Sequence, residues 1–374
     1  MSLKDVFCQD KAIGALQSAL TTDRVSHAHI FAGMEGVGKF TTARQWTKLL
    51  LCEKPAVESS STGQFADSCG SCESCRLFEA GSHPDFAHVY KELLEFTKDG
   101  KDRAAPRDLV IDVIREFLVD KVSMRPTLSQ RKVFVVSEAE KLNTSSQNCL
   151  LKVLEEPPRY CHIILLCTQL ERLLPTIRSR CQIIRFGPID QDRIIERIAK
   201  MGLESRAAQY FARLAQGSIG QACQWARLEL AGAKLYQAKT EIIDSLAGVS
   251  LAATLALAEK LLDKAKQTGT IWADLEKTTS KTDINRRAIK LIIHMLICAF
   301  RDVITLQLTP EKSPVNLDQR RQIEALCRRF DARRAVDAVS DCCQMLQWID
   351  ANVNEKLIFE HLLLRLPVRD TIAA

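Results

Sequence analysis

The sequence has no long uninterrupted hydrophobic run. Its longest apolar stretch, Ile289 to Phe300, is broken by Lys290 and His294 and is too short to span a bilayer. The first residues, Met1 to Val6, lack the apolar segment of a secretory signal. We therefore expect no membrane span and a cytoplasmic location, where cysteines stay reduced.

A strong excess of one charge is also missing, as is any internal repeat. The chain has 52 basic and 46 acidic side chains and a net charge of +6. This mild excess permits a nucleic-acid partner without requiring one. Arginines are dense between Arg320 and Arg334, where a DNA-facing surface and a solvated or subunit-facing helix both stay open.

The chain is long and rich in cysteine. Its 374 residues, 46% hydrophobic and 26% charged, are typical of a globular protein with two or three domains. Fourteen cysteines are more than a chain of this size needs for stability. In a reducing compartment, a tight cysteine cluster indicates a metal site rather than disulfides.

Short apolar runs alternate with helical patterns through the first half of the chain. The runs that we expect to be strands are Ala28–Ala32, Phe86–Tyr90, Val133–Val136, His162–Cys167 and Ile183–Phe186. Continuous apolar strands separated by helices predict a parallel sheet that is covered on both faces. Residues 53–68 and 97–108 are polar and are expected to be surface loops.

Two helices of this half are clearly marked. One covers residues 41–51, and the other precedes Pro157–Pro158, which should end it. For the second helix we expect a capping box formed by Thr144 and Gln147.

Beyond Pro188 the strand patterns stop and helical periodicity continues to the C-terminus. We expect an α/β domain at residues 1–187, a small helical domain at 188–247 and a larger helical domain at 248–374. The α/β domain should contain an inserted metal-binding module at residues 52–75.

A glycine-rich segment follows the first strand and precedes a helix. Backbone N–H groups in such a loop can surround phosphate oxygens, and a lysine neutralises their charge. The pattern G-x-x-x-x-G-K-[ST] is met at each fixed position except the last, where Phe40 stands. The residues predicted to bind a nucleotide are Gly33, Gly36, Gly38, Lys39 and Thr41. The alternative is a plain glycine-rich turn.

Both positions that would face Mg²⁺ are altered. Phe40 has no hydroxyl, and Ser137 stands where a buried strand would end in aspartate. Glu138 still occupies the position that would orient the attacking water. Losing a bound metal removes several kcal/mol of transition-state stabilisation, and about 4 kcal/mol is a thousandfold in rate. We therefore expect weak binding of ATP or ADP and little or no hydrolysis.

Four cysteines have the spacing of a zinc site. They are Cys52, Cys69, Cys72 and Cys75, and Gly70 eases the turn between the second and third. Four thiolates can close a tetrahedral Zn²⁺ site and leave no position open for catalysis. A set of free cysteines is the alternative, and His83 is a possible substitute ligand.

An arginine lies between the last two predicted strands, in Ser179–Arg180–Cys181. From composition alone, such an arginine is an ordinary surface residue or a carboxylate partner.

Taken together, these features show that the sequence resembles the clamp-loader subunits of bacterial DNA polymerase III, and the delta-prime branch in particular. Besides the loop and the cysteines, the matching segments are Ala12–Leu20, His27–Phe31, Ala80–Phe86, Ile111–Arg115, Lys132–Leu142, Asn148–Pro158, Leu174–Gln182 and Gly217–Ser218. The helical remainder matches only in type and length.

The resemblance implies an AAA+ module of two domains and a helical collar that joins five subunits into a ring. Such a ring loads a sliding clamp on primed DNA. Residues 179–181 look like the family's SRC motif, whose arginine reaches the ATP of the neighbouring subunit, which makes Arg180 the implied arginine finger. Thr168 matches the family's sensor residue, and Gln221 replaces a sensing arginine of the ATPase subunits.

Within the family, gamma and tau are ATPases, whereas delta-prime subunits often have a degraded site and act as stators. The changes at Phe40, Ser137 and Gln221 favour a stator whose own ATPase activity is absent or weak. The implied partners are gamma or tau, delta, and, through the complex, the clamp and primer-template DNA. A divergent gamma/tau-like ATPase, with Thr41 or water holding Mg²⁺, and a zinc-bearing DNA-binding protein are the alternatives.

Overall fold

The computed structural model describes residues 2–60, 63–98, 107–248, 253–277, 279–350 and 353–366. The chain forms two compact units. The first is Met1–Asp190 with Gly217–Gly220, and the second is Gln191–Gln216 with Gln221–Ala374.

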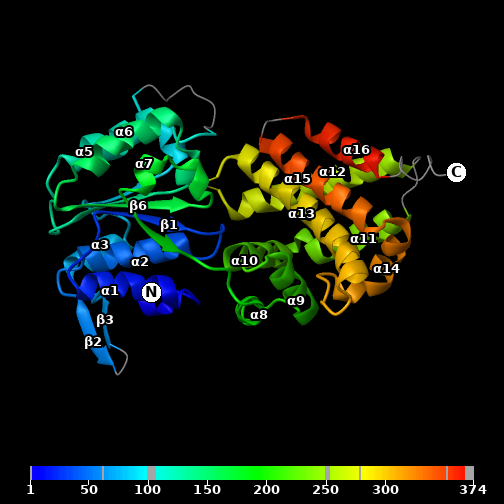
Figure 1. Cartoon of the computed structure of the whole chain (residues 1–374), viewed down its shortest axis with the longest axis horizontal. Helices are drawn as coiled ribbons and strands as arrows, with labels where there is room; N and C mark the ends of the chain where they lie inside the picture. The colour runs from blue at the N-terminus through cyan, green and yellow to red at the C-terminus, as the bar shows by residue number, and fades with distance from the viewer. Residues whose placement is uncertain are drawn as a thin grey trace. The chain divides into compact units, whose positions relative to one another are not determined.

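A five-stranded parallel sheet forms the centre of the first unit (Figure 1). Its order is β4–β5–β6–β1–β7, with β1 Ala28–Ala32, β4 Phe86–Val89, β5 Lys132–Val136, β6 Cys161–Cys167 and β7 Gln182–Arg185. Each predicted strand is present, and its ends lie within one residue of those expected. The parallel α/β sheet that the sequence predicts is confirmed.

Helices cover both faces of this sheet (Figure 1). One face carries α1 (Asp10–Thr21), α2 (Lys39–Leu51) and α3 (Glu73–Glu79). The other carries α4 (Ile111–Ile114), a π-helical turn at Arg115–Val119, α5 (Asp120–Val122), α6 (Thr144–Glu155) and α7 (Pro175–Arg178). Short 3₁₀ turns lie at Leu3–Asp5, Lys91–Phe96, Ala139–Lys141 and Leu170–Arg172.

The strands are apolar throughout because neighbouring residues point to opposite faces, and both faces are buried. In β5, Val133 and Val135 pack with α1 and α2, whereas Phe134 and Val136 pack with α4 and α6. The first unit therefore has two hydrophobic layers, one on each side of the sheet.

The prediction of a surface loop at residues 53–68 is wrong. Residues 53–68 contain an antiparallel hairpin of β2 (Ala56–Ser60) and β3 (Gly63–Asp67). The Gln17 side chain accepts from Ala66 N and donates to Ala66 O, both at 2.8 Å, which ties the hairpin to α1. Of the second predicted loop, residues 99–106 lie outside the described part of the chain.

The predicted capping box of α6 is also wrong. Asn143 caps this helix, and its side-chain oxygen accepts from Ser146 N at 2.8 Å. The Gln147 amide instead donates to Leu142 O and accepts from Leu174 N. The helix ends at Glu155, shortly before the two prolines, as expected.

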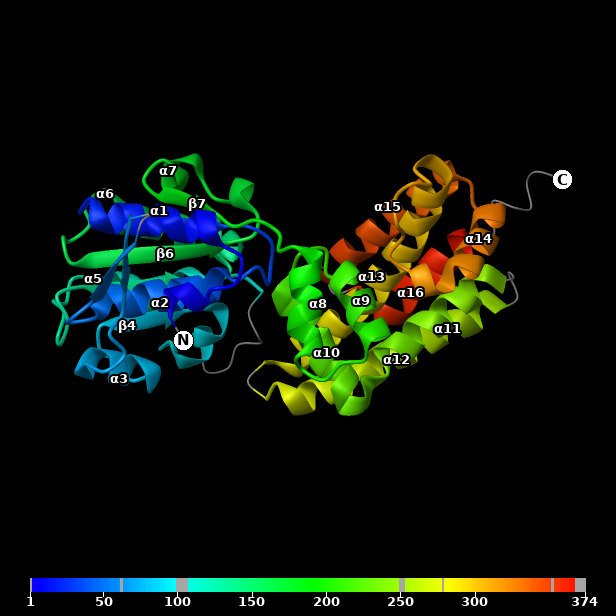
Figure 2. The ribbon, with the colours of Figure 1, turned by 90° about the horizontal axis from the view of Figure 1, so that it is seen from below.

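In the second unit, the described residues form helices and no strands, and the first two residues of α10 belong to the first unit (Figure 2). The α-helices are α8 Gln191–Ala199, α9 Ser205–Leu214, α10 Ile219–Leu228, α11 Leu235–Gly248, α12 Thr254–Leu275, α13 Lys281–Leu308, α14 Arg320–Arg329, α15 Ala332–Asp350 and α16 Glu355–Arg365. A π-turn covers Glu229–Ala233, and a 3₁₀ turn covers Leu317–Gln319. The division at residues 247 and 248 stays a prediction. Among the described helices, none has the length and apolarity to cross a bilayer.

Candidate functional site

The glycine-rich loop connects the end of β1 with the start of α2. Gly36 and Gly38 have φ angles of 75° and 100°, which glycine adopts without strain. At Gly33 a Cβ would lie 2.6 Å from Phe186 O, so only glycine fits that position. The predicted loop residues are therefore brought together at the N-terminus of α2, where the free N–H groups of a helix favour an anion.

Lys39 folds back onto this loop. Its ammonium donates to Gly33 O and Met34 O, each at 2.6 Å, and the residue is only 8% exposed. Burial lowers the pKa of Lys39, and the nearby carboxylates of Glu140 and Glu35 oppose that change. The charge that would neutralise phosphate is thus held by loop carbonyls.

A turn at Gly217–Gly220, which belongs to the same unit, rests on the loop. Gly220 N donates to Gly36 O, and the Ser218 hydroxyl donates to Glu35 O, both at 2.8 Å. A Cβ at Gly220 would lie 2.8 Å from Gly36 Cα. The loop conformation is therefore fixed by neighbouring backbone.

Aromatic and hydroxyl groups occupy the two positions where Mg²⁺ ligands are expected. The Phe40 ring lies 4.9 Å from the ring of His88, and His88 Nε2 is 2.8 Å from the Ser137 hydroxyl. Burial, followed by the charge of Arg44, lowers the pKa of His88 to about 4, so its ring is neutral. Thr41, the proposed substitute ligand, lies half-buried in the first turn of α2.

These residues do not fit Mg²⁺, which prefers several hard oxygen ligands in octahedral geometry. Phe40 offers no oxygen, and the Ser137 hydroxyl is already paired with His88. Sequence reasoning missed His88, although a histidine inside an apolar strand pattern is a detectable signal.

Glu138 and Thr168 are also engaged by their own chain. Glu138 has a left-handed φ of 52°, and its carboxylate pairs with Lys141. The Thr168 hydroxyl donates to Glu140 Oε1 at 2.7 Å, and its N–H donates to Glu140 Oε2 at 3.1 Å. Glu140, which sequence reasoning also missed, therefore holds the predicted sensor.

Arg180 follows α7 and lies at the end of α6. Its Nη2 is 2.9 Å from Glu155 Oε1, and its Nη1 donates to Thr176 O at 3.1 Å. The side chain is 36% exposed. Neither described contact of the guanidinium is with the phosphate loop.

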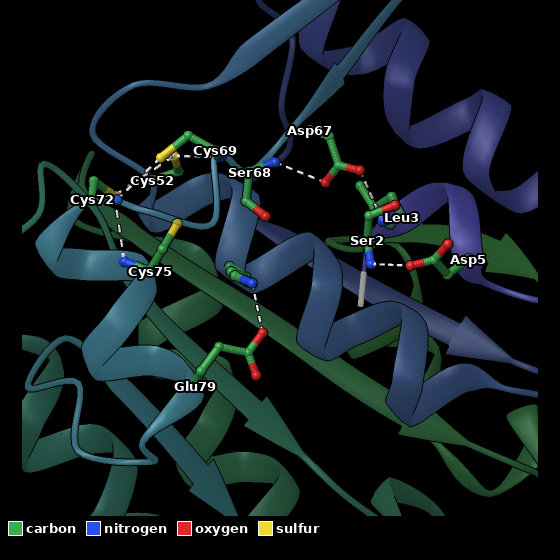
Figure 3. A network of polar contacts seen from close by, with 11 residues as sticks. Ser2, Leu3, Asp5, Cys52, Asp67, Ser68, Cys69, Cys72, Cys75 and Glu79 are labelled. Atoms are coloured by element: carbon green, nitrogen blue, oxygen red, sulfur yellow. Dashed lines mark hydrogen bonds and ion pairs between the residues drawn. The ribbon is translucent and has the colours of Figure 1, made fainter.

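The four predicted zinc ligands converge (Figure 3). Their sulfur atoms lie within 4.8 Å of one another, with Cys52 Sγ 3.6 Å from Cys69 Sγ and 4.0 Å from Cys72 Sγ. A tetrahedral Zn²⁺ with Zn–S bonds of 2.3 Å needs sulfur separations of about 3.8 Å. The geometry and the thiol donor set therefore fit Zn²⁺.

Backbone N–H groups surround these sulfur atoms. Cys69 N, Cys72 N and Cys75 N each donate to the sulfur of the preceding ligand, at 3.3 to 3.4 Å. The N–H groups of Ser71 and Cys72 lower the pKa of Cys69 to about 6, whereas burial raises that of Cys75. Such donors stabilise the thiolate that a metal needs.

Contacts around the cluster hold it in the unit (Figure 3). The Lys48 ammonium of α2 and the Glu79 carboxylate of α3 are 2.5 Å apart. At the base of the hairpin, the Asp67 carboxylate accepts from Leu3 N at 3.1 Å and from Ser68 N at 2.7 Å.

His83, the possible substitute ligand, lies outside the cysteine cluster. Its Nδ1 accepts from Asp85 N at 3.1 Å, so Nε2 carries the proton toward the Ser74 hydroxyl at 2.9 Å. Ser74 in turn donates to Leu51 O at 2.7 Å. Burial lowers the pKa of His83. This histidine therefore connects α3 with the end of α2.

Comparisons with known proteins cover most of the chain. Residues 8–190 match a family described as DNA polymerase III, delta subunit, and residues 251–367 match its C-terminal counterpart. The delta' subunit of Bacillus subtilis DNA polymerase III is 25% identical over 358 residues, 96% of each chain. The delta' subunit of Pseudomonas aeruginosa is 36% identical over 156 residues, 42% of each chain.

The tau and gamma subunits match a shorter part. The DNA polymerase III subunit tau/gamma of Haemophilus influenzae is 34% identical over 221 residues, 58% of this chain and 29% of that protein. The chain thus spans less than a third of the length of these larger relatives.

Proposed function

Because the chain belongs to the DNA polymerase III delta-subunit family and is a delta-prime-like clamp-loader subunit, we propose that it acts as a largely non-hydrolysing stator. In this role it supports the ring of subunits and supplies Arg180 to the ATP bound by a neighbouring ATPase subunit. Its partners are gamma or tau and delta, and it reaches the sliding clamp and primer-template DNA through the complex, in the cytoplasm.

The observation that carries this proposal is that side chains at the positions of an ATPase site are engaged by other groups of the same unit. Lys39 is held by loop carbonyls, Ser137 by His88, and Thr168 by Glu140. Each is occupied by its own unit, so a bound nucleotide would have to displace these contacts without the help of Mg²⁺. ATP or ADP should therefore bind weakly, and hydrolysis should be slow or absent.

The arginine differs from those groups because it is partly exposed and has donors to spare. A guanidinium has five N–H donors; Arg180 donates one from Nη1 to Thr176 O, and its Nη2 forms an ion pair with Glu155. A guanidinium supplied from a neighbouring subunit stabilises charge that develops on the transferred phosphoryl group. This is what Arg180 would contribute.

The cysteine cluster would hold a structural Zn²⁺. Four protein ligands fill the tetrahedral coordination shell, so no position remains for water or a substrate. Zn²⁺ would fix α3 and the β2–β3 hairpin against the end of α2, and it would take no part in hydrolysis.

The test is Arg180→Ala in the complex reconstituted from its own subunits, with a working phosphate loop only in the subunit next to this chain. We expect intact assembly by size-exclusion chromatography and a fall of about 10³-fold in single-turnover ATP hydrolysis. Arg172→Ala, an exposed arginine of the same segment, is the control. An unchanged rate with Arg180→Ala would refute the role.

The retained glycines and Lys39 favour a second candidate, a divergent gamma/tau-like ATPase. Steady-state hydrolysis by the isolated chain separates the two. Turnover of about one per second, abolished by Lys39→Ala, would establish the ATPase and exclude the stator.

A further inference from the structure

Two segments that are distant in the sequence meet at Arg180. Glu155 is the last residue of α6, and its carboxylate lies 2.9 Å from Arg180 Nη2. Glu155 is 50% exposed and Arg180 is 36% exposed. Neither side chain is needed to fill the hydrophobic core, so we consider what their pairing does to the orientation of the guanidinium.

The contacts of Arg180 bias its guanidinium toward one orientation. Nη2 is held by Glu155, and Nη1 is held by the backbone carbonyl of Thr176 in α7. An arginine side chain is otherwise rotationally free, and that freedom would be lost when it engages a phosphate. Two contacts from different helices impose the orientation in advance.

The contact leaves the arginine able to bind an anion. Glu155 Oε1 lies 2.9 Å from Nη2, and Nη1 donates one hydrogen bond to Thr176 O. A carboxylate engages at most two N–H groups of a guanidinium, so at least two of the five N–H donors remain for an anion. An ion pair that is half exposed is weak and does not compete strongly with a phosphate.

We propose that Glu155 is a positioning residue for Arg180, and that it orients the guanidinium toward the phosphates bound by the neighbouring subunit. The inference rests on the proposed function. Orientation matters most in the transition state, because there the phosphoryl charge must be met at a defined position. Removal of Glu155 should therefore lower the rate of hydrolysis and change the apparent KM for ATP by less than about twofold.

The experiment is a double-mutant cycle in the same reconstituted complex. Wild type, Glu155→Ala, Arg180→Ala and the double variant are compared by ATP hydrolysis at the adjacent subunit. We expect Glu155→Ala to lower kcat by about tenfold in the wild-type background and to have no further effect beside Arg180→Ala. Glu155→Gln, which keeps an acceptor oxygen, should restore most of the rate.

The neighbouring exposed residue provides the control, because Glu156→Ala should leave the rate unchanged. Equal losses from Glu155→Ala in both backgrounds would overturn the proposal, since they would indicate a general structural effect. A rate that Glu155→Ala leaves unchanged would also overturn it. The proposed function fails by a separate result, an Arg180→Ala complex that hydrolyses ATP at the wild-type rate.

Discussion

The α/β unit contains two places where a bound cation is expected, the cysteine cluster and the phosphate loop. They differ in the ligand atoms that their residues offer. At the cysteine cluster, four thiols converge within 4.8 Å, and backbone N–H groups stabilise their sulfur atoms. At the phosphate loop, the two expected ligand positions hold Phe40 and Ser137, which both contact His88. One place fits its metal and the other does not.

The two places correspond to two different uses of a metal, as a structural crosslink and as an aid to hydrolysis. A metal that crosslinks the chain acts by staying bound, so its four ligands must all be present. A metal that assists hydrolysis acts only if a nucleotide is turned over. At the loop, a neutral histidine and its contacts take over the packing between α2, β4 and β5. Of the two places, the described residues supply a complete ligand set only at the cysteine cluster.

Removal of the cluster should have the largest effect. Cys75→Ser, a change at a fully buried ligand, should abolish stoichiometric zinc and destabilise the α/β unit by about 4 kcal/mol or more, roughly 10 °C in Tm. Elemental analysis and thermal unfolding measure the two effects.

Cys161→Ser is the matched control, since Cys161 is equally buried in β6 but lies outside the cluster. It should keep its zinc and lose far less stability. Freshly purified wild-type protein without zinc would contradict the assignment.

The stability of the α/β unit should depend on pH through His88. Its pKa falls from 6.5 to about 4 on folding, so the unfolded chain binds more protons between these values. The stabilisation is therefore fully present above about pH 6.5 and is lost as the pH falls toward 4. A difference of this size is worth about 3 kcal/mol.

Denaturant unfolding between pH 7 and 4 measures this dependence. His88→Phe keeps an aromatic ring beside Phe40 but cannot titrate, so its stability curve should be flatter by about 3 kcal/mol over that interval. Parallel curves for the variant and the wild type would show that His88 does not carry the effect.

Ser74 of α3 should contribute to stability through its hydrogen bonds with His83 and with the end of α2. Ser74→Ala leaves the buried Nε2–H of His83 with only the Ser129 hydroxyl, at 3.3 Å. The variant loses two buried hydrogen bonds, the one from His83 and the one to Leu51 O, which together cost about 2 kcal/mol and are resolved by chemical denaturation. Ser82→Ala, at an exposed serine just after α3, should cost less than about 0.5 kcal/mol. Similar losses in both variants would contradict the special position of Ser74.

Much of the first unit could be predicted from the sequence because its signals are local. Buried parallel strands are continuous apolar runs, and the spacing of the four cysteines is visible directly. The β2–β3 hairpin was hidden because its serines resemble a loop, whereas tertiary contacts such as Gln17 with Ala66 hold it in place. The cap of α6 differed by a single residue, from Thr144 to Asn143.

The partners of the site residues could not be predicted from the sequence. Glu140 with Thr168 and Glu155 with Arg180 are pairs between residues that only folding brings together. Residue types alone therefore indicated which groups an ATPase would need, and the contacts indicate which of them are already engaged.

The smallest expected effect comes from rebuilding the missing ligands at the loop. Phe40→Thr with Ser137→Asp supplies a hydroxyl and a carboxylate at the two altered positions, which are the oxygen donors that Mg²⁺ prefers. Binding of ATP to the wild type should differ by less than about twofold between Mg²⁺ and a chelator, because no ligand set exists for the ion. The double variant should bind about tenfold more tightly with Mg²⁺, or about 1.4 kcal/mol. Isothermal titration with each nucleotide solution measures both.

Phe40→Leu with Ser137→Ala is the matched control, since it disrupts the same contacts with His88 without adding a ligand. If that control gains the same dependence on Mg²⁺, or if the wild type already has it, the contrast between the two cation sites fails, because the loop would then hold the metal through groups other than residues 40 and 137.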